Sequence, residues 1–262
     1  MDLRAMSWNI WWRFGDDWRA RQDRVVEVLK ALRPDVVGLQ EVWSTPSRTQ
    51  ADVLAAELGM HAAFAPESFP PVPSPPEHPD QAGADLGVAV LSRWPVVRQQ
   101  AKRLPSTRRH RPPALLVTVD HPLGPLHVCS VSTEWSSTYA DDHLAQTEAL
   151  ADLVTNPTLD GDLPVVIAGD LRAGPDADAL RPLLRVTVDA WTLGGGQPDA
   201  ATRCAVPGAP RQPQERVDYL LLRPGRPGAG VSVRDVALAG RTDDEPAPSN
   251  HLAVAADIVL DG

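Results

Sequence analysis

The chain has 262 residues, of which 43% are hydrophobic, and carries a formal net charge of −9 at pH 7. This length is enough to bury a sizeable core, and we expect one domain over residues 1–262. The acidic balance makes long nucleic acid an unlikely partner, because phosphate backbones bind basic surfaces. With no apolar run long enough to span a bilayer and no leader pattern after Met1, we expect no membrane partner and a cytoplasmic location.

Hydrophobic periodicity predicts alternating strands and helices in the first half of the chain. Strands are expected at residues 3–10, 35–43 and 88–94, and helices at residues 19–34 and 49–59. The first helix shows apolar residues at i, i+3, i+4 and i+7, and Pro34 ends it. Residues 66–85 are so rich in proline that we expect an extended loop, which either forms the rim of a pocket or is a passive insertion.

The second half predicts a hairpin, two helices and further strands. The hairpin joins residues 114–120 to 126–132, the helices cover 141–154 and 176–184, and the strands cover 165–171, 216–222, 231–240 and 251–260. The hairpin and the closing strands exclude a purely parallel sheet. We therefore predict an α/β fold in which two mixed sheets pack together with helices outside.

Polar residues fall at the ends of several predicted strands. They are Asn9, Glu41, Asp170, Asp218 and His251. A single polar residue at a strand end is usually a cap or a surface group, but five could converge on one rim. Oxygen ligands of this kind suit Mg²⁺ or Mn²⁺, with a histidine available to protonate or stabilise phosphate oxygens. The pattern favours attack of a positioned water on a phosphoester.

Six short motifs, MSWNI, LQEVW, GVAVLSRWP, VVIAGDL, RVDYLLL and SNHLAVAADI, carry a family resemblance in their order and spacing. Together they resemble the endonuclease/exonuclease/phosphatase superfamily, the DNase I-like fold. The resemblance covers nearly the whole chain. It implies a four-layer α/β-sandwich and a hydrolase that cleaves phosphodiesters or phosphomonoesters with a divalent metal.

By this resemblance each of the five strand-end residues has a role. Asn9 and Glu41 match the metal-site residues, and Asp170 matches the aspartate that orients the attacking water. Asp218 matches the aspartate before an aromatic residue, and His251 matches the closing histidine.

Three other positions depart from the family pattern. Arg172 stands where an asparagine normally contacts the phosphate, and Asn250 replaces a carboxylate that partners a metal or the histidine. Alignment through Trp135 places Ser132 where the family has a histidine. Loss of a carboxylate that orients a histidine costs about 10⁴ in rate in the serine-protease triad, so such changes could abolish an ordinary nuclease and with it the metal.

Arg172 admits three interpretations. Its planar fork could clamp an anionic substrate, it could pair with Asp170 and weaken that carboxylate as a base, or it could point into solvent. Asn250 is either a site residue or a turn residue, and Glu134 is either a rim carboxylate or a solvated strand end.

Two further features remain open. Residues 103–111 gather basic side chains and form either a solvated connection or a phosphate-facing loop. The aromatic residues near the N-terminus, including Trp8, Trp11 and Trp12, form either core packing or a platform for a ring-bearing substrate. Cys129 and Cys204 are expected to be small core residues.

The favoured function is metal-dependent hydrolysis of a small phosphorylated molecule or phosphodiester. Asn9 and Glu41 would hold Mg²⁺ or Mn²⁺, Asp170, Asp218 and His251 would act catalytically, and Arg172, Asn250, Ser132 and Trp135 would contact an anionic small-molecule substrate. The alternatives are a metal-independent, non-nuclease reaction in specialised metabolism, and a non-catalytic binding protein. The sequence indicates no oligomeric state.

Overall fold

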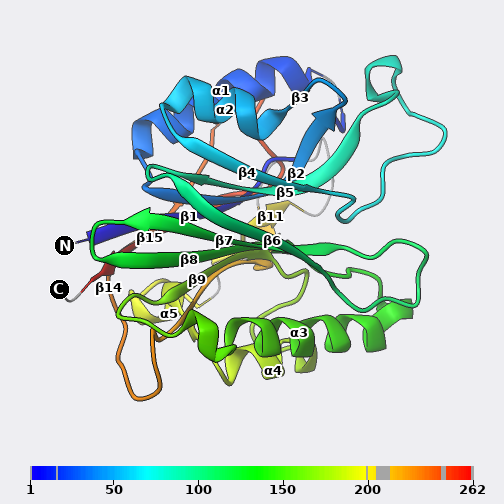
Figure 1. The fold of residues 1–262 in the computed structure, drawn as a ribbon. Coiled ribbons are helices and arrows are strands. Elements are labelled where there is room, and N and C mark those ends of the chain that lie inside the picture. The colour runs from blue at the N-terminus through cyan, green and yellow to red at the C-terminus, as the bar shows by residue number, and fades with distance from the viewer. Residues whose placement is uncertain (1, 16, 199, 205–212, 243–245, 261–262) are drawn as a thin grey trace.

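The computed structural model describes residues 2–15, 17–198, 200–204, 213–242 and 246–260. Its strands form two large mixed sheets that pack face to face, with helices on both outer faces (Figure 1). This is the predicted four-layer α/β-sandwich. Within the described ranges, no helix is long and apolar enough to cross a membrane.

The first sheet has seven strands in the order β14-β15-β1-β2-β5-β4, with β3 paired to β2. The strands are β1 (Asp2–Asn9), β2 (Val36–Thr45), β3 (Arg48–Thr49), β4 (His61–Pro66), β5 (Asp85–Ser92), β14 (Ser232–Ala239) and β15 (Ala253–Val259). Only β1 and β2 run parallel among the paired strands of this sheet. Helix α1 (Trp18–Leu32) connects them.

The second sheet has six strands in the order β10-β13-β9-β8-β7-β6. They are β6 (Val96–Arg103), β7 (Pro113–His121), β8 (Gly124–Ser132), β9 (Val165–Asp170), β10 (Val188–Asp189) and β13 (Asp218–Arg223). Strands β8 and β9 are parallel and are joined through α3 (Ala140–Val154). A small separate sheet pairs β11 (Arg203–Cys204) with β12 (Pro213–Glu215).

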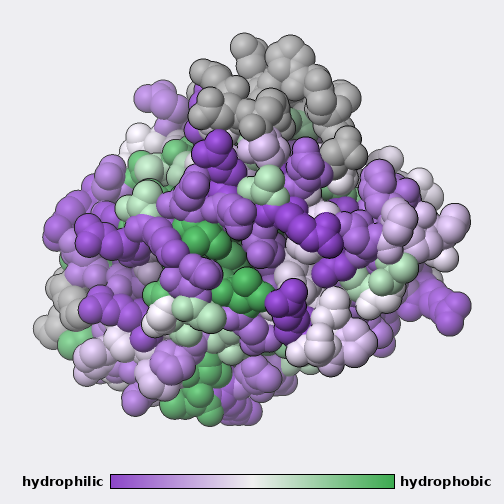
Figure 2. Space-filling view, turned by 90° about the horizontal axis from the view of Figure 1, so that it is seen from above, coloured by the Kyte–Doolittle hydropathy of each residue, from purple (hydrophilic) through white to green (hydrophobic). Residues whose placement is uncertain are grey.

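Apolar side chains form three packed layers that follow from the strand alternation. One cluster lies between the sheets and includes Val36, Val128 and Ala168. A second packs α1 and α2 (Gln50–Leu58) on the first sheet, and a third packs α3 and α4 (Arg181–Leu184) on the second. From the side of α1 and α2 the surface is mostly hydrophilic, with smaller hydrophobic areas, as expected for amphipathic helices (Figure 2).

The two parallel crossovers fix where the site lies. Because β1 and β2 run the same way, as do β8 and β9, each pair brings two carboxyl ends to one edge of its sheet. Strands β13 and β15 run antiparallel to β9 and β1, so their first residues reach the same edges. Six strand ends from two sheets therefore meet at one end of the sandwich.

The sheets approach closely where β2 crosses β9. A Cβ added to Gly38 would lie 2.3 Å from the Cβ of Ala168, so no larger residue fits there without a shift. Beside it, the Gln40 amide donates to the Ala168 carbonyl at 3.2 Å, and the Ser130 hydroxyl donates to the Leu39 carbonyl at 3.0 Å. These contacts fix the distance between the two sheets near the end of the sandwich where the polar residues lie.

Most of the predicted elements are present. The helix expected at residues 176–184 is instead a 3₁₀ turn, Asp178–Leu180, followed by the short α4, because Pro182 lacks the amide hydrogen of a helix interior. Strands β4 and β6 and the short α5 (Ala190–Leu193) are not predicted by the sequence pattern. Strand β6 is mostly polar and exposed, so it lacks a buried apolar alternation. The proline-rich segment contains only a 3₁₀ turn, Pro79–Gln81, between β4 and β5.

The close approach at Gly38 gives a stability prediction. We expect Gly38→Ala to lower the free energy of unfolding by about 1–3 kcal/mol, because overpacking forces the two sheets apart. Denaturant unfolding followed by tryptophan fluorescence measures this change. The double variant Gly38→Ala, Ala168→Gly should recover part of the loss. Gly161→Ala is the control, since an added Cβ there meets no atom within 4 Å; an equal loss in that variant would refute the packing explanation.

Candidate active site

The strand ends bring together all five polar residues singled out in the sequence. Asn9 ends β1, Glu41 lies in β2, Asp170 ends β9, Asp218 begins β13, and His251 precedes β15. Each is buried, with at most 4% of its surface exposed. Hydrogen bonds join Asn9 to Glu41 and Asp170, and His251 to Asp218. The two groups lie side by side, since ligand atoms of Asp170, Asp218 and His251 are within 4.8 Å of one another, as the prediction of a single rim anticipated.

Asn9 joins carboxylates from the two sheets. Its Nδ2 donates to Glu41 Oε1 at 2.8 Å and to Asp170 Oδ2 at 2.9 Å, while its Oδ1 accepts the backbone amide of Trp11 at 2.9 Å. The nitrogen and the oxygen of the Asn9 side-chain amide thus both form hydrogen bonds. Asn9 acts here as a bridge between Glu41 and Asp170.

Arg172 forms a second bridge between the same two carboxylates. Its Nη2 donates to Glu41 Oε1 at 2.6 Å, and its Nε lies 2.6 Å from Asp170 Oδ2. Only 8% of the Arg172 side chain is exposed, which excludes the interpretation of a solvent-facing arginine. Burial lowers the pKa of the guanidinium, but the carboxylates of Asp170, Glu41 and Asp218 outweigh burial and raise the pKa above its ordinary value.

His251 pairs with Asp218. The ring Nδ1 lies 2.8 Å from Asp218 Oδ2, and Nε2 makes no hydrogen bond to a described residue. Burial lowers the pKa of His251, but Asp218 and Asp170 outweigh it and Arg172 opposes them only in part, so the pKa is raised above the ordinary value. The imidazolium form is therefore more favoured than in a free histidine, and Nδ1–H donates to Asp218, because a carboxylate only accepts.

Several buried polar atoms around the cluster have no hydrogen-bond partner among the described residues. They are Asp170 Oδ1, Asp218 Oδ1, Ser132 Oγ and Asn250 Oδ1. Buried polar groups are usually paired, because an unpaired one loses about 1–3 kcal/mol of solvation. Four such atoms near one another make this end of the sandwich a candidate binding site.

Ser132 and Asn250 lie beside this cluster in different ways. Ser132 is fully buried and pairs in register with Asp170 across β8 and β9. Asn250 lines a small pocket together with His251. The histidine keeps a carboxylate partner in Asp218, so the amide at position 250 does not deprive it of one.

Trp135 lies on a rim built from aromatic and basic residues. It is 39% exposed, packs edge-on against buried Phe69, and stacks under Arg108 with 4.7 Å between the guanidinium carbon and the ring centroid. Glu134 is fully buried and pairs with Arg108, while its Oε1 accepts the amides of Trp135 and Ser136. Glu134 is therefore neither a free rim carboxylate nor a solvated strand end, since it holds the rim together.

The basic segment and the proline-rich segment form parts of the same rim. Arg103 pairs with Glu67, and His110 Nε2 lies 2.8 Å from the Ser68 carbonyl. The cations of residues 103 and 108 thus have protein partners. This arrangement favours a loop fixed in place over a freely solvated connection.

The aromatic residues near the N-terminus are mainly core residues. Trp8 and Trp12 are at most 2% exposed, and Trp11 is half-buried beneath the guanidinium of Arg21. Cys129 and Cys204 are small buried residues, as expected. Trp135, at 39% exposed, presents more of its ring to solvent than the N-terminal tryptophans Trp8, Trp11 and Trp12.

Two residues that the sequence does not single out, His143 and Tyr219, position Arg172. His143 Nε2 lies 2.9 Å from the Leu171 carbonyl, and the Tyr219 hydroxyl donates to the Ala173 carbonyl at 2.7 Å. The carbonyls on either side of Arg172 are thus held by side chains from α3 and β13. In the sequence, the only indication of such a role is that Tyr219 follows Asp218 directly.

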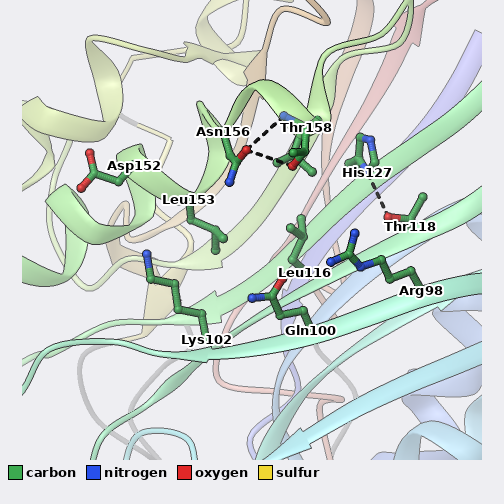
Figure 3. Close-up of a pocket in the computed structure, with 11 residues that line it drawn as sticks. Arg98, Gln100, Lys102, Leu116, Thr118, His127, Asp152, Leu153, Asn156 and Thr158 are labelled. Atoms are coloured by element: carbon green, nitrogen blue, oxygen red, sulfur yellow. Dashed lines mark hydrogen bonds between the residues drawn. The ribbon is translucent and has the colours of Figure 1, made fainter.

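A separate cavity of about 330 Å³ lies on the outer face of the second sheet, beside α3. Arg98, Lys102 and His127 contribute to its lining, and Thr118 bonds His127 there (Figure 3). None of the strand-end residues lines it. We therefore place the candidate active site at the strand-end cluster.

The comparison with protein families agrees with this geometry. The Endonuclease/Exonuclease/phosphatase family matches residues 6–251. The chain belongs to this family. Its members generally cleave phosphoester bonds as phosphodiesterases or phosphatases and use divalent metals.

Solved structures show the same fold. The human Nocturnin catalytic domain with bound sulfate is 20% identical, with a TM-score of 0.78, and the match covers 99% of this chain and 95% of that chain. Humanized D. rerio TDP2 is 18% identical, with a TM-score of 0.74 and coverage of 98% and 99%. A family protein from Beutenbergia cavernae is 26% identical, with a TM-score of 0.74 and coverage of 100% and 72%. No curated protein matches the chain.

The donor set does not fit a divalent cation in this arrangement. Glu41 Oε1 and Asp170 Oδ2 each contact both Asn9 and Arg172. Ligand atoms of Asp170, Asp218 and His251 do lie within 4.8 Å of one another, but His251 Nδ1 is already paired with Asp218 Oδ2 at 2.8 Å. A divalent cation there would also face the guanidinium, and a double and a single positive charge ~4 Å apart repel by about 8 kcal/mol in a partly shielded site.

The Asp218–His251 pair predicts a pH-dependent stability. The pKa of His251 is raised in the folded protein, so its charged form stabilises the fold fully below the ordinary value of 6.5 and this stabilisation is lost as pH rises through the folded value. We expect Asp218→Asn to cost about 3 kcal/mol at pH 6 and much less at alkaline pH. Urea unfolding at a series of pH values measures the difference.

Asp257→Asn is the matched control. Asp257 pairs with Arg4 at 2.7 Å, and arginine does not titrate in this range, so the cost of that variant should stay constant. A cost of Asp218→Asn that is equally independent of pH would contradict a charged His251.

Proposed function

We propose that this chain hydrolyses a phosphoester of a small anionic molecule at the strand-end cluster. The observation that carries the proposal is the convergence of two unpaired carboxylate oxygens, Asp170 Oδ1 and Asp218 Oδ1, with a charged histidine and a guanidinium in one buried place. The family supplies the reaction class, since its members cleave phosphoesters.

Asp170, His251 and Arg172 would each have a separate role as water displaces the leaving group at phosphorus. Asp170 Oδ1 orients a water and takes its proton as the water oxygen attacks phosphorus. The bond from phosphorus to the leaving oxygen breaks, and Nε2–H of His251 protonates that oxygen, while Asp218 holds the imidazolium. Arg172 Nη1, which makes no hydrogen bond to a described residue, is free to contact the phosphoryl oxygens.

The surroundings favour a small substrate. The chain carries a net charge of −9, which opposes association with long polyanions. Of the four arginines in residues 103–111, Arg103 and Arg108 are paired with Glu67 and Glu134, which reduces the charge offered to a nucleic-acid backbone, while Arg109 and Arg111 are exposed. The half-exposed ring of Trp135 suits a substrate with a flat apolar group. D. rerio TDP2 has been solved with a single-strand DNA product, and we expect this chain to act on smaller molecules.

Turnover of chromogenic phosphoesters tests the proposal. We expect purified protein to hydrolyse para-nitrophenyl phosphate or bis(para-nitrophenyl) phosphate, and Asp170→Asn to lower kcat/KM by about 10² to 10⁴, the usual worth of a positioned proton acceptor. Release of para-nitrophenolate gives the rate. Single-stranded DNA should be a poor substrate in the same buffer.

Asp178→Asn is the matched control, because this aspartate is 83% exposed and pairs only with Arg181 among the described residues. It should retain full activity. If the parent binds a phosphoester but neither it nor any variant turns it over, the hydrolase proposal fails and the same cluster is an anion-binding site.

A further inference from the structure

The guanidinium of Arg172 occupies the place where a cation would join the two sheets. Its Nη2 is 2.6 Å from Glu41 Oε1, and its Nε is 2.6 Å from Asp170 Oδ2. One carboxylate comes from β2 of the first sheet and the other from β9 of the second. A single positive group therefore neutralises the two acidic residues that the family pattern assigns to metal and water.

The arginine is built into this position. The backbone at Arg172 has φ 54° and that at Glu41 has φ 54°, both left-handed conformations that cost a non-glycine residue energy. His143 holds the carbonyl before Arg172, and Tyr219 holds the one after it. The Leu171 amide donates to the Val217 carbonyl at 2.8 Å. Two strained residues that meet through their side chains, each fixed by neighbours, indicate a functional contact.

We propose that Arg172 replaces the divalent cation of this family, so that the site binds the phosphoryl group of its substrate through a protein-supplied charge and works without metal. This inference rests on the proposed function for the identity of the substrate. The contacts of Arg172 with Glu41 and Asp170 do not depend on the proposed function.

A guanidinium and a divalent metal ion offer a substrate different chemistry. A guanidinium has planar N–H donors and can bind two phosphoryl oxygens, but it has no vacant coordination site and cannot acidify a bound water. Activation of the water then falls to Asp170 Oδ1, whose other oxygen is held by Asn9 and Arg172. The site is thus arranged for binding and orientation.

Binding of Mn²⁺ tests the inference apart from any activity. We expect the parent protein to bind no Mn²⁺ at the cluster at millimolar metal, as measured by electron paramagnetic resonance of free Mn²⁺ and by calorimetry. Its melting temperature should be the same in EDTA and in Mn²⁺. One tightly bound ion per chain that is lost in Glu41→Gln would overturn the proposal.

Two variants at position 172 separate charge from shape. Arg172→Gln removes the charge, leaves Glu41 and Asp170 uncompensated, and should bind Mn²⁺ at least tenfold more tightly than the parent. Its melting temperature in EDTA should be low and should rise on addition of Mn²⁺. Arg172→Lys keeps a cation and should exclude the metal like the parent. A folded Arg172→Gln that binds no Mn²⁺ would contradict the proposal, and if this variant does not fold, the parent and Arg172→Lys decide it.

Hydrolysis in EDTA distinguishes this inference from the proposed function. A parent that hydrolyses phosphoesters at an undiminished rate in EDTA supports both. A parent that binds no Mn²⁺ and shows no hydrolysis supports the role of Arg172 and contradicts the hydrolase. A parent that binds Mn²⁺ and requires it for turnover supports the hydrolase and overturns the role of Arg172.

Discussion

The structure of the site depends on two carboxylates held together from opposite sheets. Glu41 and Asp170 would repel one another if nothing lay between them, and their separation from water would increase that repulsion. The amide of Asn9 and the guanidinium of Arg172 both contact the same two oxygens. This shared contact makes close burial of the acidic groups possible, and it sets the charge that any ligand meets.

The fold makes this contact geometrically possible. Parallel crossovers through α1 and α3 bring the ends of β1, β2, β8 and β9 to one edge, and the small residue Gly38 lets the sheets lie close beneath it. The site is thus made by strand ends, which are rigid, while the rim is made by loops. Differences in rim residues such as Trp135 can change which molecule binds without altering the centre.

The architecture and the meeting of the five strand-end residues could be predicted from the sequence, because both leave periodic or positional signals. The buried strands β2 and β9 are continuous apolar runs, and each carries a polar residue near its end. The exposed strand β6 carries no such signal. The family resemblance supplied the roles of Asn9 and Asp170, and the composition of the chain supplied none.

The direction in which the Arg172 side chain points could not be predicted from the sequence. Arg172 could have clamped a substrate, paired with Asp170 or faced solvent, since a two-residue spacing after a strand allows each of these. Its direction is set by a left-handed backbone and by His143 and Tyr219, which lie 29 and 47 positions away along the chain. Likewise, the partner of His251 is Asp218 at 33 positions' distance, although the neighbouring Asn250 had drawn attention in the sequence.

These distant contacts also explain how one substitution could change the chemistry while the fold persists. A metal ion and a guanidinium both neutralise paired carboxylates, so either stabilises the junction of the two sheets. They differ in what they offer a substrate, because a metal ion activates water and a guanidinium positions oxygens. Retention of Asp170, Asp218 and His251 beside Arg172 therefore keeps proton transfer possible and shifts its burden to the carboxylate and the imidazolium. Under the proposed replacement, Arg172 keeps the stabilising role of the cation, and Asp170 and His251 take over its part in the reaction.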